Sequence, residues 1–266
     1  MLRATLIQTQ LQKSKTKAIE HILKLLKKAG SSNSDIVCLP ELWYPKAVTN
    51  FEVEFAEIMD AAREYNITII PGAFLEKIND QEEGNNNNNN NNFLQISSPV
   101  IATDGMIIGR QLKIHPFGSQ RKVVKAGTKV QVFESSNCKF GIGICYDIVF
   151  PEVARSLARK GADILFFPSR IRNEGIKPWH MYVQVRALEN RIPIAAPNIC
   201  GSNTYKGASI FVDFDYNNKT DIAIPKPRVG ASVNEQILVM DIDLKRTRRL
   251  RKKRFEDFRN KFYDLF

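Results

Sequence analysis

The segment around Cys145 constrains the fold more than any other, because it places a cysteine where an apolar stretch ends and a helix begins. Residues 140–144, Phe-Gly-Ile-Gly-Ile, are typical of a buried strand whose glycines let another backbone approach closely. Pro151 suits the first turn of a helix, and apolar residues follow it at helical spacing: Val153, Ala154, Leu157 and Ala158. We therefore expect the Cys145 thiol to face outward near a helix N-terminus, whose partial positive charge favours the thiolate. The alternative for a single cysteine is a small buried hydrophobe.

Two further predicted strands end in a charged side chain. Residues 36–40 form an apolar run that stops at Glu41, and residues 105–112 lead to Lys113. In an α/β sheet the carboxyl ends of the strands face one crevice, where ligands bind. We therefore expect Glu41, Lys113 and Cys145 to meet at one site, although a surface salt bridge is the simplest interpretation of the first two taken alone.

The rest of the chain alternates predicted strands and helices within one domain. A single helix is expected over residues 51–65, and residues 95–101 and 106–112 are expected to pair as a hairpin. We assign residues 1–244 to this domain. Residues 245–266 form a basic C-terminal segment that is expected to pack on the domain or at a subunit contact.

Further short segments follow the three candidate residues in a fixed order. They are Trp179, the Arg186-Ala-Leu-Glu189-Asn190 stretch, Asn198 with Gly201, Gly207 with Ser209, and Asp241-Ile-Asp243. Together with Glu41, Lys113 and Cys145, this order resembles the nitrilase superfamily of carbon–nitrogen hydrolases over nearly the whole chain. The resemblance implies an α/β fold of the four-layer α-β-β-α sandwich type. It also implies a homodimer or a higher homo-oligomer.

The resemblance assigns a role to each residue of the triad. Glu41 takes the thiol proton and later hands it to the leaving amine, and Lys113 stabilises the oxyanion of the tetrahedral intermediate. Cys145 attacks the carbonyl carbon and forms a thioester that water hydrolyses. The expected reaction cleaves a non-peptide C–N bond in a small linear amide or N-carbamoyl compound. Amide hydrolysis ranks above nitrile hydrolysis, because most branches of the superfamily are amidases or carbamoylases.

A papain-like pair of cysteine and histidine is the competing mechanism, since the chain has three histidines. His21 lies on an amphipathic helical stretch and is expected to be solvated. His115 closely follows the candidate lysine, and His180 lies after the predicted strand that ends near residue 167. None of them lies in a pattern that marks a base for Cys145, so we favour glutamate as the base.

Two departures from the superfamily pattern concern the substrate. Most members carry a second glutamate a few residues after the lysine, but residues 115–127 contain no acid, and Gln120 is nearest to the expected place. Many ω-amidase-like members have an arginine after the Cys-Tyr pair, where this chain has Val149. Arg170 or Arg172 is the candidate replacement for binding a substrate carboxylate, and a solvent-facing loop arginine is the alternative. The candidate substrate-binding residues are Trp43, Tyr44, Phe117, Gln120, Tyr146, Arg170 and Trp179.

Composition excludes several other classes of function. At 266 residues with 43% apolar content, the chain can bury a large core. No run reaches the ~18 apolar residues that a membrane helix needs, and the N-terminus enters a predicted strand at once, which argues against secretion and against a membrane partner. The four cysteines lack zinc-ligand spacing. Reduced thiols indicate a cytoplasmic protein, and neither a metal nor an organic cofactor is implied.

Two segments stand apart from this pattern. Residues 85–92 are eight asparagines, which have nothing to pack and predict a mobile loop. Residues 245–254 hold eight of the basic residues behind the net charge of +11. Such a cluster can bind phosphates, so the alternative function is a catalytically weakened nitrilase-fold protein with a regulatory or nucleic-acid-associated role. The aromatic residues that follow are more typical of the apolar stripe of a terminal helix: Phe255, Phe258, Phe262 and Tyr263.

Overall fold

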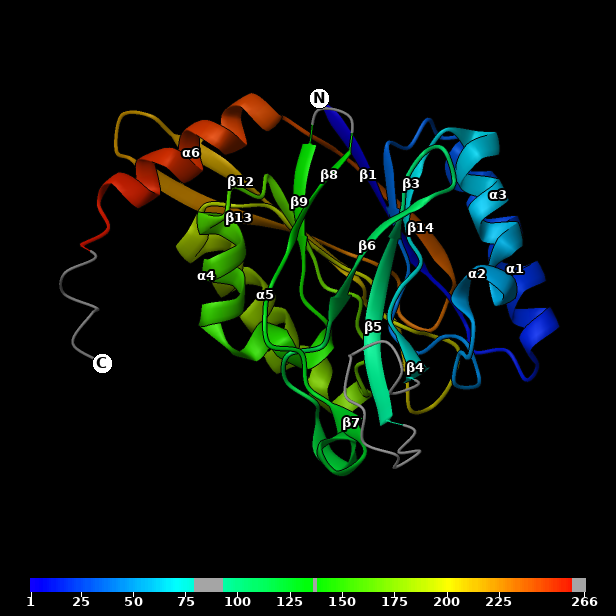
Figure 1. Ribbon diagram of the computed structural model, residues 1–266. Coiled ribbons are helices and arrows are strands. Elements are labelled where there is room, and N and C mark those ends of the chain that lie inside the picture. Colours follow the sequence, from blue (N-terminus) through cyan, green and yellow to red (C-terminus); the bar gives the residue numbers. More distant parts are fainter. Residues whose placement is uncertain (79–92, 136–137, 260–266) are drawn as a thin grey trace.

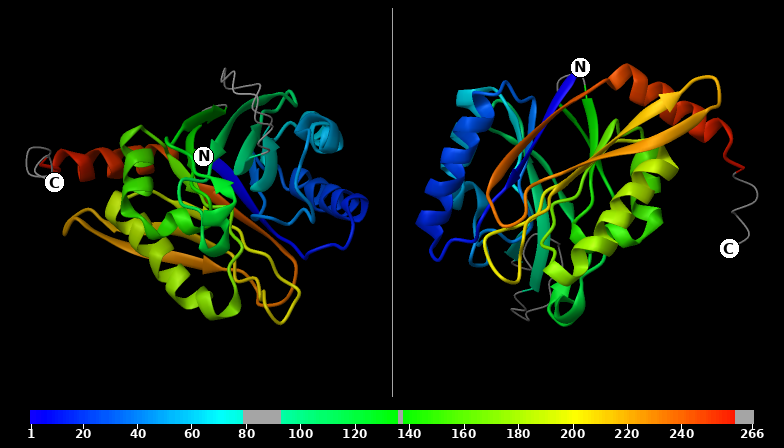
Figure 2. Two further views of the ribbon diagram at one scale, coloured as in Figure 1. Left: turned by 60° about the horizontal axis from the view of Figure 1, so that its bottom comes forward. Right: turned by 180° about the vertical axis from the view of Figure 1, so that it is seen from behind.

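Two β-sheets packed face to face, with helices on both outer sides, make up the computed structural model of the protein (Figure 1 and Figure 2). The structure describes residues 1–78, 93–135 and 138–259. The asparagine run, residues 85–92, lies outside the described residues, as do Phe262 and Tyr263. The predicted four-layer α-β-β-α sandwich is confirmed.

The first sheet comes mainly from the N-terminal half of the chain. Its strands are β1 (Leu2–Gln8), β2 (Ile36–Cys38), β3 (Thr68–Ile70), β4 (Phe74–Ile78), β5 (Phe93–Ile101), β6 (Ile107–Leu112), β7 (Val124–Lys125) and β14 (Gln236–Ile242). Their order is β14-β1-β2-β3-β5-β4, and β6 and β7 also pair with β5. The second sheet comes from the C-terminal half, in the order β13-β12-β11-β10-β9-β8. Its strands are β8 (Val132–Ser135), β9 (Cys138–Ile142), β10 (Ile164–Phe166), β11 (Ile194–Ala196), β12 (Ile210–Asn217) and β13 (Ile222–Val229).

Helices cover the outer face of each sheet (Figure 2). On the first sheet lie α1 (Lys15–Gly30), α2 (Phe51–Glu54) and α3 (Ala56–Tyr65). On the second lie α4 (Pro151–Arg159) and α5 (Ile176–Asn190). A last helix, α6 (Leu244–Glu256), follows β14 and passes from the first sheet to the side of the second (Figure 1).

Alternation along the buried strands separates the core layers. Ile36 and Cys38 of β2 point into the core between the two sheets, whereas Val37 points into the layer under α1 and α3. Leu6 and Ile7 of β1 divide in the same way. Because successive side chains face opposite sides of a strand, a strand buried on both faces must be apolar at nearly every position. This is why these short strands stand out in the sequence.

The structure corrects some of the predicted elements. The single helix expected over residues 51–65 is wrong, since α2 and α3 are separated at Phe55, whose φ of −123° is not helical. The hairpin is confirmed as β5 paired antiparallel with β6. Strands β4, β7, β8 and β13 were not predicted. Strand β13 lies at a sheet edge and contains Pro225 and Pro227, which weaken a strand signal because proline cannot donate to the ladder.

Acidic side chains of the domain hold the basic helix α6. Asp163 accepts hydrogen bonds from the Arg248 and Arg251 guanidinium groups at 2.7 and 3.0 Å. Burial would raise the pKa of Asp163, but these two arginines and the Lys139 N–H lower it below its usual value. Two further ion pairs are Arg246–Asp213 and Lys253–Asp221. Part of the positive charge of α6 is therefore neutralised by the domain itself.

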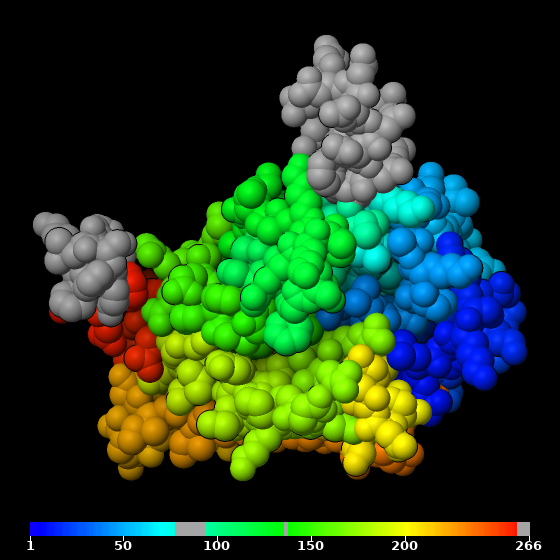
Figure 3. All heavy atoms as spheres, turned by 90° about the horizontal axis from the view of Figure 1, so that it is seen from below, coloured from blue at the N-terminus to red at the C-terminus, as the bar shows by residue number. Residues whose placement is uncertain are grey.

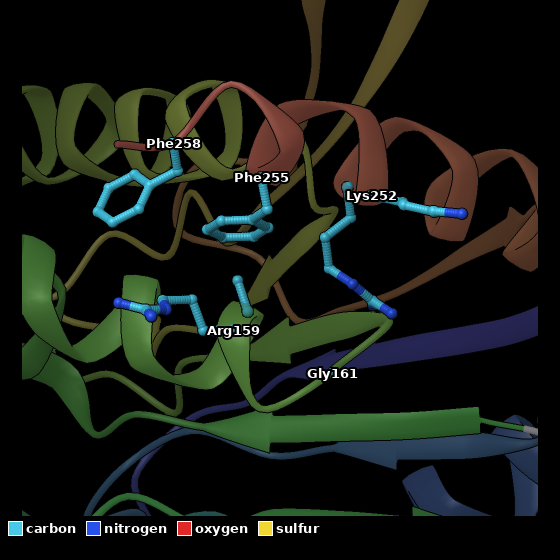
Figure 4. A pocket seen from close by; sticks show the side chains of 7 residues that line it. Arg159, Gly161, Lys252, Phe255 and Phe258 are labelled. Atoms are coloured by element: carbon cyan, nitrogen blue, oxygen red, sulfur yellow. The ribbon is translucent and has the colours of Figure 1, made fainter. Parts of the chain in front are cut away.

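A cavity of about 310 Å³ lies between α4 and α6 (Figure 4). The Arg155 guanidinium lies 5.6 Å from the ring centroid of Phe255 and 5.4 Å from that of Phe258. The lining residues are Ala158, Arg159, Gly161, Arg251, Lys252, Phe255 and Phe258. No thiol or carboxylate is among these described residues, so the cavity offers neither the nucleophile nor the base that amide hydrolysis needs.

Candidate active site

The three residues predicted to meet line a single pocket of about 690 Å³. Glu41 follows β2, Lys113 follows β6 and Cys145 follows β9, so the pocket lies where strand ends of the two sheets approach each other. Backbone hydrogen bonds hold each of the three residues in place. The Glu41 N–H donates to the Ser169 carbonyl oxygen at 3.2 Å. The Lys113 N–H donates to the Ile96 carbonyl oxygen at 2.8 Å, and the Cys145 N–H donates to the Pro168 carbonyl oxygen at 2.9 Å. Figure 3 shows the face on which green, yellow-green and yellow segments near residues 120, 180 and 203 meet.

Lys113 lies at the centre of this arrangement. Its ammonium donates to Glu41 Oε1 at 2.7 Å and to Gln120 Oε1 at 3.1 Å. The Lys113 and Glu41 side chains are only 1% and 2% exposed, so this ion pair is almost fully desolvated. Burial alone would lower the pKa of Lys113, but the negative charge of Glu41 and the other nearby acidic groups raises it, which keeps the ammonium charged. An ammonium has three N–H donors, and the third is left for a ligand.

Cys145 occupies a strained backbone position. Its φ is +49°, a conformation that costs about 1 kcal/mol or more for a residue with a side chain. Cys145 is near a helix N-terminus, since it opens a 3₁₀ turn, Cys145–Val149, that precedes α4, but the expectation that its thiol faces outward is wrong, because the residue is buried. The expected thiolate is also wrong. Burial and the negative charge of Glu41 raise the thiol pKa, against the opposing effects of Lys113 and the Arg170 N–H. The resting thiol is therefore protonated and needs a base.

Asp147, which sequence reasoning left without a role, joins the cysteine turn to the lysine loop. Its side chain is fully buried and accepts hydrogen bonds from the Ile144 N–H at 2.9 Å and the His115 N–H at 2.8 Å. His115 Nδ1 lies 2.9 Å from the same carboxylate. Burial raises the Asp147 pKa, and these donors oppose that shift. Its place two residues after the cysteine was the available sequence signal. A role in positioning becomes visible only when the two loops are seen together.

Each histidine makes its contacts outside the Cys145 pocket. His115 is stacked on Phe150 and paired with Asp147, and His180 Nε2 lies 2.7 Å from the Ala208 carbonyl oxygen. His21 is not simply solvated as expected, because its ring lies 2.5 Å from Glu235. All three histidines lie in the described part of the chain, and none lines the Cys145 pocket. A papain-like mechanism therefore lacks a histidine that could serve as the base for Cys145.

The pocket walls include most of the predicted substrate-binding residues: Phe117, Gln120, Tyr146, Arg170 and Trp179. The prediction for Trp43 and Tyr44 is wrong. Trp43 is 1% exposed and donates its Nε1–H to the Pro71 carbonyl, and Tyr44 is 5% exposed and donates its hydroxyl to Glu54. Both rings belong to the aromatic cluster beneath α2 and α3. The chain turns sharply after Glu41, where Leu42 has a φ of +52°, and the rings that follow face away from the pocket.

Sequence reasoning missed several residues of the pocket. Leu42 lines it because of the turn just described, and Val149 lines it from the 3₁₀ turn. Tyr182 and Tyr205 contribute rings from α5 and from the loop after β11. Leu42 and Val149 lie close to the triad in sequence, but no sequence spacing relates Tyr182 and Tyr205 to it, so only the three-dimensional arrangement could have found those two rings.

A family model for carbon-nitrogen hydrolases matches residues 3–252. The chain belongs to the carbon-nitrogen hydrolase family. This carbon-nitrogen hydrolase is 28% identical over 212 residues to the omega-amidase NIT2 of Xenopus tropicalis, covering 73% of this chain and 72% of that protein. It is 25% identical over 285 residues to the human omega-amidase NIT2, covering 99% and 96%. It is 30% identical over 215 residues to the probable nitrilase C965.09 of Schizosaccharomyces pombe, covering 80% and 72%.

Solved structures share the fold of this carbon-nitrogen hydrolase. A carbon-nitrogen hydrolase from Helicobacter pylori G27 superposes with a TM-score of 0.79 at 24% identity, covering 99% of this chain and 97% of the other. An amidase of the nitrilase superfamily from Nesterenkonia sp. AN1 superposes with a TM-score of 0.75 at 17% identity, covering 99% and 96%. None of the helices in the described part of the chain has the length and apolar character needed to span a lipid bilayer.

Proposed function

We propose that this hydrolase is a thiol amidohydrolase that cleaves a non-peptide C–N bond of a small linear amide or N-carbamoyl compound. The observation that carries the proposal is the desolvated Lys113 ammonium, which is held by Glu41 and Gln120 beside the Cys145 thiol in one pocket. The pocket volume, about 690 Å³, lies in the usual range for small-molecule sites. The names of the omega-amidase relatives support ω-amides as the first substrates to test.

The mechanism starts from a protonated thiol. Glu41 acts on Cys145 through its charge and as a hydrogen-bond acceptor, and it takes the thiol proton as the sulfur attacks the substrate carbonyl. The free N–H of Lys113 stabilises the oxyanion that forms. Glu41 then passes the proton to the leaving nitrogen, so ammonia or an amine departs and a Cys145 thioester remains. Water, deprotonated by Glu41, hydrolyses the thioester and releases a carboxylic acid and the thiol.

We infer that Gln120, the residue nearest the expected place, substitutes for the second glutamate that the resemblance implies. Its Oε1 accepts hydrogen bonds from Lys113 and from the Phe117 N–H, so it keeps the acceptor of a glutamate without the charge. A neutral partner holds the ammonium less strongly than a carboxylate does. We infer that Gln120 positions Lys113 and that Glu41 supplies the negative charge opposite it.

The regulatory or nucleic-acid alternative has less support. Four basic side chains of α6 are ion-paired to Asp163, Asp213 and Asp221, which leaves less free charge for phosphates. Retention on immobilised RNA that falls steeply with salt, together with an inactive pocket, would favour the alternative.

We further propose a homodimer or higher homo-oligomer that works in the cytoplasm. On α5, Met181 and Val185 are 60% and 48% exposed, and apolar side chains on an outer helix favour burial by a second subunit. All four cysteines are unpaired, which suits a reducing compartment. Light scattering on the purified protein tests the assembly, and a monomer at micromolar concentration would contradict it.

Ammonia release tests the proposed function. A panel of simple amides, ω-amides and N-carbamoyl compounds is incubated with the wild-type protein and with Cys145→Ala. Release that disappears in the variant is the expected result. Release that persists in Cys145→Ala would exclude the thiol mechanism, and silence across the panel from a folded protein would favour the non-catalytic alternative.

A further inference from the structure

Arginines from the ends of two helices meet in a small cavity beside the second sheet. Arg191 directly follows α5 and Arg254 lies in the last turn of α6, and both line a cavity of about 240 Å³. Tyr216 of β12 and Asp221, in the turn before β13, line it as well. The cavity shares no described residue with the Cys145 pocket, so a ligand bound in it would be separate from the amide substrate.

Each of these two guanidinium groups has a donor without an acceptor. The Nε atoms of Arg191 and Arg254 are buried and form no hydrogen bond, and Arg254 makes no ion pair with another residue in the described part of the chain. Arg191 donates from Nη2 to the Asp221 carbonyl oxygen at 3.3 Å, and its guanidinium lies 5.6 Å from the centroid of the Tyr216 ring. Because a buried donor without an acceptor is costly, two of them in one cavity indicate a missing acceptor.

Positive charges also repel each other in this cavity. Burial and then the positive charge of Arg254 lower the pKa of Arg191 below its ordinary value, against the opposing effects of Asp221 and Tyr216. Arg191 nevertheless stays charged, since arginine is not deprotonated in proteins. The fold therefore holds two like charges close together, and an anion between them would remove the repulsion.

The acids at this cavity leave a surplus of positive charge. Asp221 is already used, because it pairs with Lys253 at 2.9 Å and accepts a hydrogen bond from the Tyr216 hydroxyl. Asp257 is exposed at the end of α6 and makes no ion pair with another described residue. Against these two acids, the described lining residues include three basic side chains: Arg191, Lys253 and Arg254. The cavity is thus net positive, although Asp257 weakens its attraction for an anion.

We propose that Arg191 and Arg254 bind a phosphate group in this cavity, as inorganic phosphate or as a small phosphomonoester. A guanidinium presents a planar fork of N–H donors that fits two oxygens of a phosphate, and the unpaired Nε of each arginine is one arm of such a fork. A dianion balances both guanidinium groups, whereas a carboxylate balances only one.

A nucleic-acid backbone fits this cavity less well than a phosphomonoester does. Each phosphate of the backbone is a diester with a single charge, and the backbone binds through many such contacts along a surface. Three other basic side chains of α6 are already paired to acids of the domain: Arg246, Arg248 and Arg251. A small phosphate in the cavity would join the last turn of α6 to the end of α5, so it should stabilise the folded protein.

Phosphorus NMR titration at constant ionic strength tests the site with inorganic phosphate, methyl phosphate and dimethyl phosphate. We expect the first two to bind at one site per chain with a Kd of about 1 mM or less. Dimethyl phosphate, a diester with one charge, should bind at least about 10-fold more weakly. Equal binding of the monoester and the diester would overturn the proposal and favour a nucleic-acid backbone.

Matched variants of α6 assign the binding to the cavity. Arg254→Gln should weaken methyl phosphate binding by about 10-fold or more, because one guanidinium is lost. Arg249→Gln removes an exposed arginine of the same helix that does not line the cavity, and it should leave the Kd unchanged. Asp257→Asn should tighten binding by about 2- to 5-fold, since it removes a negative charge from the lining. Equal losses in Arg254→Gln and Arg249→Gln would show a diffuse charge effect and contradict the site.

The charge of the ligand provides an independent test. A phosphomonoester loses its second proton near pH 6, so methyl phosphate should bind about 10-fold more weakly at about pH 5 than at about pH 7.5. Sulfate stays a dianion over this range, so its binding corrects for any titration of the protein itself. Methyl phosphate binding that changes no more than sulfate binding would overturn the preference for a dianion.

An acidic side chain from a second copy of the chain is the competing occupant of the cavity. Light scattering on Arg254→Gln distinguishes the two. An unchanged molecular mass together with lost phosphate binding is the expected result. A lower mass in the variant, with no phosphate binding by the wild-type protein, would show that a protein carboxylate fills the cavity and would overturn the proposal.

Discussion

The active-site pocket and the C-terminal helix α6 treat positive charge in opposite ways. Residues 245–254 carry eight basic side chains, and the domain pairs several of them with Asp163, Asp213 and Asp221. Among the described residues that line the pocket, Arg170 is the arginine without an acidic partner, because Arg172 pairs with Glu174. Four of the eight basic side chains hold α6 on the domain, whereas the Arg170 guanidinium has no acidic partner among the described residues. The number of basic residues in a segment therefore predicts anion binding less well than the number of them that have no acidic partner in the folded protein.

The largest expected effect removes the nucleophile of the pocket. Cys145→Ala should lower kcat by about 10⁴-fold or more, because no thioester can form. The melting temperature should change little. Steady-state ammonia release and thermal unfolding measure the two quantities. Cys200→Ala removes another buried thiol that does not line the pocket, and equal loss of activity in that control would contradict the assignment.

The second prediction concerns the base. Glu41→Gln should lower the rate of thioester formation by about 10²- to 10⁴-fold, because the thiol loses its proton acceptor. The substitution should also lower the pKa of the Cys145 thiol. The negative charge of Glu41 raises the Cys145 pKa, so its removal should lower that pKa and move thiol alkylation by iodoacetamide to lower pH. Glu57→Gln, an exposed glutamate on α3, is the matched control. Normal acylation in Glu41→Gln would refute the role of base.

The third prediction tests the opposite side of the comparison. Asp163→Asn should lower the free energy of unfolding by about 1–3 kcal/mol, since Arg248 and Arg251 lose their shared carboxylate. It should also strengthen salt-sensitive retention on RNA, because it releases positive charge on α6. Chemical denaturation and RNA binding at two salt concentrations measure these effects.

A control variant and the pH dependence of stability sharpen the test of Asp163. Asp215→Asn breaks a largely exposed pair with Lys226 and should change stability by less than about 0.5 kcal/mol. The pKa of Asp163 is lowered in the folded protein, so its stabilising effect is present above the ordinary carboxyl pKa and is lost as the pH falls through the folded value. RNA binding and stability that do not change in Asp163→Asn would show that these ion pairs do not hold the helix.

The smallest expected effect is at Gln120. Gln120→Glu should preserve or raise kcat/KM, by at most about 10-fold, because the carboxylate holds Lys113 more strongly than the amide does. Gln120→Leu removes the acceptor for both Lys113 and the Phe117 N–H, so it should be the less active of the two variants. Measured kcat/KM values rank them. A large loss in Gln120→Glu would mean that the neutral amide is specifically required.

Local pattern was enough to predict alternating strands and helices and to bring the triad together, while the resemblance to the nitrilase superfamily implied the four-layer sandwich. Strands buried on both faces are almost continuously apolar, so β1, β2 and β9 were visible in the sequence, and Glu41 and Cys145 follow two of them. Lys113 follows β6, which is only partly buried. The break at Phe55 and the edge strand β13 were missed. A one-residue irregularity and a proline-containing edge strand have weak periodicity, and tertiary packing decides their conformation.

Side-chain direction and charge state were decided only by the tertiary structure. The sequence placed Trp43 beside Glu41 but could not determine that the turn at Leu42 sends its ring into the core. It predicted a thiolate at Cys145, whereas burial beside Glu41 keeps the thiol protonated. Which of Arg170 and Arg172 is free depends on Glu174, which pairs with only one of them. Residue order thus determined which chemical groups the site could contain, and packing determined which of them are buried, paired and available, because desolvation and pairing arise only when distant segments meet.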